Sequence, residues 1–155
     1  MSGFAACRLI AGLMLALAVT LPASADDLTR MRAVDGLVVY LGVMTTETIR
    51  THPVSYAEEH MHGGIPSGHN MYHVLVTVFD RATGERVSDA HVMARVAPLG
   101  LSGPRRTLDT MNGAGGVCYC NYFAMSGHER HRIDVVISRP DAPQPKRVTF
   151  LYQPE

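Results

Sequence analysis

Short runs of alternating apolar and polar residues, separated by glycine, proline and aspartate, follow one another from residue 36 to residue 153. A period of two places successive side chains on opposite faces of an extended chain, which is typical of strands that are buried on one face. The runs expected to form strands are residues 36–44, 71–80, 86–98, 106–112, 117–125, 131–138 and 147–153. Residues 46–52 are expected either to extend the first strand or to form another one. No segment beyond the first 25 residues keeps a 3.6-residue period over 12 positions, so an α/β fold is not expected.

Seven or so short strands in one domain predict an all-β fold, an immunoglobulin- or cupredoxin-like β-sandwich. The alternation also indicates which side chains turn inward. Those expected in the core are Ala90, Val92, Ala94, Val96, Ile133, Val135, Ile137, Val148, Phe150 and Tyr152. A hairpin around the turn ATGE (82–85) would pair the runs on either side of it and bring His73 near His91 and Met93.

The first 25 residues have the features of a secretory signal peptide. Arg8 provides the positive start, residues 9–21 are apolar, and the small residues ASA (23–25) form a cleavage site. We expect cleavage after Ala25 and export to the periplasm, which leaves residues 26–155 as a single β-sandwich domain. The apolar run is too short to predict a permanent membrane span, although an anchored N-terminal helix is the alternative.

Charge argues against a nucleic-acid partner. The whole chain has 14 basic and 14 acidic residues, and removal of the signal peptide takes away one basic side chain. Proteins that bind nucleic acid need a basic surface to neutralise phosphates. None is indicated here.

Histidine and methionine are concentrated in HMHGGIPSGHNMYH, residues 60–73, and five of the eight histidines fall between residues 52 and 73. Imidazole nitrogen suits copper and zinc, and thioether sulfur selects Cu(I), so mixed donors in an exported chain favour copper. Glycines within the stretch allow it to fold back on itself. The first-choice ligands are His60, Met61, His62, His69, Met71 and His73, and the next are His91 and Met93.

Cys118 and Cys120 are the two cysteines of the expected mature chain. On a strand, their C-x-C spacing points both side chains to one face, with Cα atoms near the upper limit for a disulfide. Three interpretations stay open: buried thiols, a strained redox-active disulfide, or a thiolate pair that holds a soft metal ion.

Catalytic motifs are missing from the sequence. It contains neither G-x-S-x-G nor H-E-x-x-H, and its GAGG stretch precedes a predicted strand rather than a helix. The order of cysteine, methionine and histidine near the C-terminal third also differs from the ligand loop of blue-copper proteins. An enzyme is therefore not expected.

The segment YHVLVTVFDRATGERVSDAHVMARV resembles the opening strands of the exported FixH/YtkA-like immunoglobulin-type β-sandwich proteins. The shared features are two alternating strands, Asp80, Gly84 and the residues Val87, Asp89 and Ala90, and the resemblance extends over roughly residues 71–138. The pair His91 and Met93 resembles the H-x-M ligands of periplasmic copper chaperones of the PCuAC type. However, His69 stands where that family's spacing has methionine. These resemblances imply copper handling in the bacterial envelope.

The sequence thus predicts a periplasmic copper chaperone that binds Cu(I) or Cu(II) through His and Met and delivers it to an envelope protein. Two alternatives remain. One is an envelope binding or assembly module without metal, and the other is a carrier of ferrous iron or zinc that uses the same imidazoles.

Overall fold

The computed structural model describes residues 29–51, 61–113 and 115–154, so the expected signal peptide and His60 lie outside the described residues. The described residues form eight strands and two short helical segments. These are β1 (Met31–Val34), β2 (Leu37–Thr45), α1 (Thr46–Thr51), the 3-10 turn η1 (Met61–Gly63), β3 (Met71–Asp80), β4 (His91–Pro98), β5 (Arg105–Gly113), β6 (Gly116–Ala124), β7 (His131–Ser138) and β8 (Lys146–Tyr152). The prediction of an all-β fold is confirmed.

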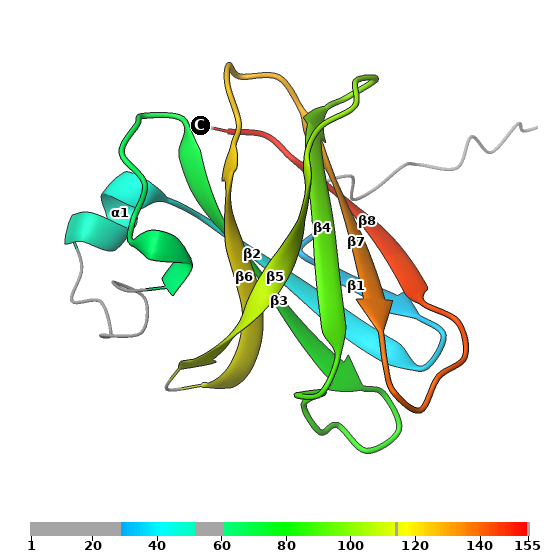
Figure 1. Ribbon diagram of the computed structural model, residues 1–155. Coiled ribbons are helices and arrows are strands. Elements are labelled where there is room, and N and C mark those ends of the chain that lie inside the picture. The colour runs from blue at the N-terminus through cyan, green and yellow to red at the C-terminus, as the bar shows by residue number, and fades with distance from the viewer. Residues whose placement is uncertain (1–28, 52–60, 114, 155) are drawn as a thin grey trace, which may run out of the picture.

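The strands form one antiparallel sheet in the order β1-β2-β3-β6-β5-β4-β7-β8. The sheet curls until β1 contacts β8, which gives a nearly closed, sandwich-like barrel (Figure 1). The barrel has two walls, one formed by β1, β2, β3 and β6 and the other by β4, β7 and β8. Strand β5 belongs to both walls, because residues 105–108 pair with β4 and residues 109–113 pair with β6. The same strand therefore contributes side chains to both halves of the molecule.

The interior of the barrel is filled by the inward face of every strand from β2 to β8. Its most deeply buried members include Val39, Val74, Val76, Val92, Tyr119, Phe123, Ile133, Val135 and Phe150, each at most 1% exposed. The inward faces predicted for residues 92–96, 133–137 and 148–152 are confirmed. Alternation alone was enough to find them because each strand is buried on this side.

The predicted hairpin between residues 71–80 and 86–98 is wrong. Strand β3 pairs with β2 and β6 on its two edges, whereas β4 pairs with β5 and β7. An isolated bridge between Phe79 and Arg86 is all that remains of the expected ladder. Asp80 Oδ1 accepts hydrogen bonds from the backbone N–H groups of Ala82 and Thr83 and closes the turn. The chain then crosses to the other wall before β4 begins.

One local prediction is wrong, and one strand was not predicted. Residues 46–51 form α1 rather than a strand, because Thr45 Oγ1 accepts the backbone N–H of Thr48 and caps the helix. Strand β1 was not predicted. It pairs with β2 through a two-residue turn in which Asp35 and Gly36 both have positive φ, at 42° and 84°.

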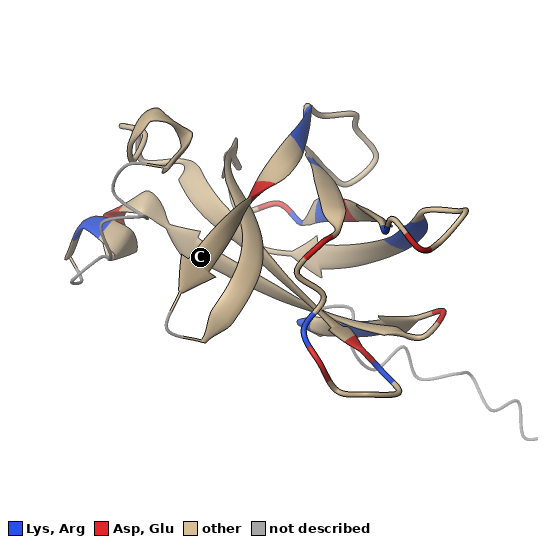
Figure 2. Cartoon of the chain, turned by 60° about the horizontal axis from the view of Figure 1, so that its bottom comes forward, with Lys and Arg blue, Asp and Glu red and all other residues tan. Residues whose placement is uncertain are grey.

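Basic and acidic segments lie close together along the strands and loops (Figure 2). Ion pairs such as Arg132–Asp134 and Arg139–Asp141 join them. Among the described residues, no helix has the length and apolar character needed to cross a membrane.

Tyr119 holds residues 81–90, the segment that crosses from β3 to β4, against the barrel. Its hydroxyl accepts the backbone N–H of Ala90 and donates to the carbonyl of Val87, both at 3.0 Å. Burial raises the pKa of Tyr119, although the hydrogen bond from Ala90 partly offsets that rise. Removal of the hydroxyl would leave two backbone groups without their partner.

We expect Tyr119→Phe to lower the free energy of unfolding by about 1–3 kcal/mol in urea titrations at pH 7. Because the folded-state pKa is raised, the contribution of the phenol is present below about pH 10 and is lost as pH rises further. The variant should therefore lose less stability than the parent above that pH. Equal stabilities of the two proteins at pH 7 would show that the hydroxyl does not fasten the segment.

Candidate metal centre

The candidate centre lies on the outer face of the wall formed by β3, β6 and β5. His73 and Leu75 point away from the barrel interior, since the neighbouring Val74 and Val76 fill it. The register sets Tyr122 opposite His73, and Cys120 opposite Leu75. On its other side, Cys120 is opposite Asp109 of β5. Antiparallel pairing thus gathers an imidazole, a thiol, a phenol and a carboxylate on one face.

A second imidazole comes from the η1 turn, which folds over this face. His62 has left-handed backbone angles (φ 59°, ψ 20°), and Gly63 follows with φ 81°. The N–H of Gly64 donates to the carbonyl of Met61 at 3.0 Å. A left-handed non-glycine residue costs about 1–3 kcal/mol and persists only when its surroundings hold it there. Here the turn lays the imidazole against the sheet, with its side chain 6% exposed.

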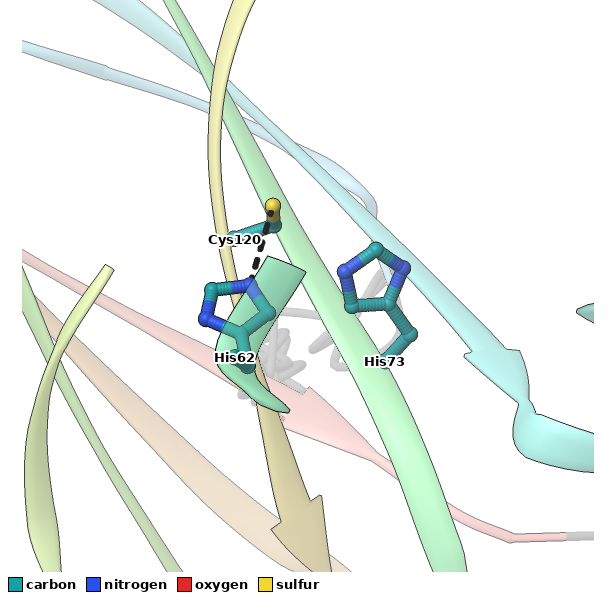
Figure 3. Close-up of side chains that lie close together, drawn as sticks. All are labelled: His62, His73 and Cys120. Carbon is teal, nitrogen blue, oxygen red and sulfur yellow. Dashed lines mark hydrogen bonds between the residues drawn. The ribbon is translucent and has the colours of Figure 1, made fainter. Parts of the chain in front are cut away.

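His62, His73 and Cys120 offer three ligand atoms that lie within 4.8 Å of one another (Figure 3). Nε2 of His62 is 3.6 Å from Sγ of Cys120. An ion about 2.0 Å from an imidazole nitrogen and about 2.3 Å from a thiolate sulfur holds those atoms about 3.5–3.7 Å apart at tetrahedral or trigonal angles. The separation between His62 and Cys120 therefore already suits one shared ion.

The surroundings orient both imidazole rings. The ring of Tyr122 stacks on His73 with centroids 4.6 Å apart and meets His62 edge-on at 5.6 Å. Oδ2 of Asp109 lies 2.8 Å from Nδ1 of His62. Metal-bound histidines commonly have a carboxylate beside the ring nitrogen that does not bind the metal, which fixes the tautomer. In the tautomer that such a pairing favours, Nδ1 carries the proton and the lone pair of Nε2 faces Cys120.

Sulfur-containing side chains surround Cys120. Met111, Cys118 and Cys120 form a buried cluster separate from the main core, and Met61 and Leu75 pack against it. Both thiols are buried, and neither forms a disulfide. The expectation that the two cysteines share a face is confirmed, and the interpretation as a disulfide does not apply to this structure.

The predicted ligands are divided among several places. His62 and His73 come together with Cys120, and Met61 packs against the buried cluster that contains Cys120. His69 is exposed, and Met71 is half-buried at the start of β3. His91 and Met93 lie on β4, which β5 separates from β6, so the structure does not bring them to this centre.

Cys120 was not among the predicted ligands. The signal that could have found it is the C-x-C pattern, which places two thiols on the same face of a strand. What the sequence could not supply is the pairing of that strand with the one that begins at Met71.

No protein-family model matches the sequence, and no curated protein matches it either. Solved structures are similar in fold. A DUF4426 family protein from Pseudomonas aeruginosa has a TM-score of 0.60 at 15% identity, covering 80% of this chain and 92% of that one.

Two further neighbours are copper-bound proteins. A copper-bound variant of FetP from uropathogenic Escherichia coli has a TM-score of 0.59 at 12% identity, covering 79% of this chain and 92% of that one. FetP was also solved as isolated after recombinant expression in the periplasm. Copper-reconstituted P19 protein from Campylobacter jejuni has a TM-score of 0.58 at 14% identity, covering 79% of this chain and 91% of that one. At these identities, the likeness shows a shared fold.

Proposed function

We propose that this chain is a periplasmic copper-binding protein, and that His62, His73 and Cys120 hold the ion. The observation that carries the proposal is the convergence of two imidazoles and one thiol, from η1, β3 and β6, on one face of the sheet. The copper-bound forms of FetP and P19, which share the fold, support copper as the metal. The sequence features of a signal peptide support export.

The donor set favours copper over the alternatives. Thiolate and imidazole are soft or borderline donors, whereas carboxylates suit harder ions. The one carboxylate that contacts these ligands among the described residues is that of Asp109, which lies 2.8 Å from Nδ1 of His62 and is not one of the three converging ligands. Ferrous iron is therefore the weaker alternative, and zinc is the competitor that an experiment has to separate from copper.

Delivery to another protein fits the position of the centre. In a tetrahedral geometry, its three ligands leave one coordination position for a donor from a partner. One of them, His62, sits on a turn whose following glycines, Gly63 and Gly64, have few backbone restrictions. The three ligand side chains are buried, so movement of this turn would expose the ion to an envelope partner while the barrel stays closed. Such a protein binds and transfers metal and needs no catalytic residues.

A thermal melt with added metal tests the proposal. A ligand that binds only the folded state stabilises it by about 2.7 kcal/mol at 100 times its dissociation constant. We expect Cu(I), added without oxygen, to raise the melting temperature by about 5–20 °C. Zinc should give a smaller increase at the same concentration. If neither metal shifts the melt, the assembly module without metal is the better account.

A second candidate function is electron transfer. Two histidines and one cysteine are also the equatorial ligands of blue-copper centres, and methionine sulfur packs beside this one. Addition of Cu(II) distinguishes the two functions. A strong thiolate-to-copper absorption band that persists for hours would favour electron transfer, and the absence of such a band would favour a carrier.

A further inference from the structure

The sulfur cluster beside the centre is larger than the proposed ligand set requires. Of its four sulfur-bearing residues, Met61, Met111, Cys118 and Cys120, the centre uses one. Met111, Cys118 and Cys120 are 5%, 7% and 0% exposed. They lie on the outer face of the wall, apart from the main core. Their common property is a soft, polarisable donor atom.

We propose that Met61, Met111 and Cys118 form a second Cu(I) position, which shares Cys120 with the centre and lets each chain hold two Cu(I) ions. This inference rests on the proposed copper-binding function. It assigns a role to Cys118 and Met111, which that function leaves unused.

The backbone register supports the second position. Cys118 is directly opposite Met111, and Cys120 is directly opposite Asp109. Sγ of Cys118 lies 3.7 Å from the carbonyl oxygen of Met111, and Sγ of Cys120 lies 3.8 Å from that of Asp109. Both thiols therefore extend toward β5 along the same face. Met61 covers the cluster from η1.

The spacing suits a bridging ion better than a disulfide. Residues two apart on a strand have Cα atoms about 6.5–7 Å apart, which is at or beyond the limit for an unstrained disulfide. Two sulfurs that are each about 2.3 Å from one ion lie about 4 Å apart or more. One Cu(I) ion therefore suits the spacing of Cys118 and Cys120 better than a disulfide does.

Charge selects the ion. A buried thiolate in an apolar cluster is costly unless a cation neutralises it. Each Cu(I) that binds a thiolate displaces the thiol proton to water, so the pair is neutral, copper stays Cu(I) and no electron is transferred. Two Cu(I) ions with two thiolates leave no net charge beneath η1. Two Zn²⁺ ions with the same two thiolates would leave two excess positive charges, and zinc gains little from thioether sulfur.

The second position also gives Cu(I) a route to the imidazoles. Met61 is only half-buried, so it is the member of the cluster that an incoming ion can reach. From there the ion can pass to Cys118 and then to Cys120, which belongs to both positions. Transfer between the two positions is then an exchange of ligands around one shared sulfur.

The test is an anaerobic titration with Cu(I) against a chromogenic Cu(I) chelator, which counts the ions held by each chain. The parent protein should hold two. The Met111→Leu/Cys118→Ala variant should hold one, and His62→Asn should also hold one. Met93→Leu on β4 is the matched control and should hold two. Because Met111→Leu conserves volume, that single variant should stay folded and bind the second ion at least about 10-fold more weakly.

The outcomes separate the two proposals. One ion in the parent, lost in His62→Asn and kept in Met111→Leu/Cys118→Ala, would overturn the second position and leave the proposed function intact. Two ions that are unaffected by His62→Asn would overturn the ligand assignment of the centre. If the double variant does not fold, an unchanged second ion in Met111→Leu overturns the second position.

Discussion

The His62→Asn variant is expected to bind Cu(I) at the centre formed by His62, His73 and Cys120 at least about 100-fold more weakly than the parent protein. His62 provides one of three converging ligand atoms, and its Nε2 lies 3.6 Å from Cys120 Sγ. Loss of groups that merely orient a metal ligand costs 10–100-fold in affinity, so loss of the ligand itself should cost more. Asparagine is the appropriate replacement because it tolerates the left-handed backbone angles at this position. Competition with a Cu(I) chelator measures the change.

Two further variants calibrate that result. Asp109→Asn should weaken Cu(I) binding by about 10–100-fold, because Asp109 contacts His62 and does not reach the ion. His91→Asn should leave the affinity unchanged, since His91 is exposed on β4. Equal losses in the His62 and His91 variants would mean that copper is bound somewhere else. An unchanged Cu(I) affinity in both variants would lead to the same conclusion.

The Phe150→Ala variant is expected to have a free energy of unfolding about 3–5 kcal/mol below that of the parent. Phe150 is 0% exposed on β8, and the guanidinium of Arg32 on β1 lies 5.8 Å from its ring centroid. Removal of the ring therefore opens a cavity at the place where the two ends of the sheet meet. Folded domains have only about 5–15 kcal/mol of stability, so the loss is a large share of the total. Urea unfolding at constant pH measures it.

Cu(I) affinity should be nearly unchanged in the Phe150 variant when it is measured well below the melting temperature. The main core and the sulfur cluster are separate groups of contacts on opposite faces of the sheet, and distant sites add independently. Leu101→Ala is the control for stability, because Leu101 is 61% exposed and should change it by less than about 0.5 kcal/mol. A loss of stability no greater than that of this control would contradict the assigned packing of Phe150.

Local patterns in the sequence predicted most of the strands, because each strand is buried on its inner face and so alternates. They did not predict which strands pair. The turn at residues 82–85 looks like a hairpin, yet Asp80 closes it locally and the chain then crosses to the other wall. Strand pairing depends on packing between segments that are far apart in the sequence, and the pattern within ten residues carries no information about it. The Asp35-Gly36 dipeptide is typical of a hairpin turn, but β1 has only four residues, which is too few to show a clear alternation.

The candidate centre could be predicted only in part, because local patterns find residues that are close in sequence and miss those that strand pairing brings together. The density of histidine in residues 60–73 pointed to His62 and His73, and the structure brings these two together. Cys120 is 47 positions beyond His73 in the sequence and becomes its neighbour only through the pairing of β3 with β6. His91 and Met93 were placed near the centre on the strength of a hairpin that does not form.

X-ray absorption at the copper edge of protein loaded with one equivalent of Cu(I) tests the central claim most directly. The account predicts both nitrogen and sulfur neighbours around copper, with the sulfur contribution reduced in Cys120→Ser and the imidazole contribution reduced in His62→Asn. A spectrum with light-atom ligands only, or one that neither substitution alters, would show that His62, His73 and Cys120 do not hold the ion.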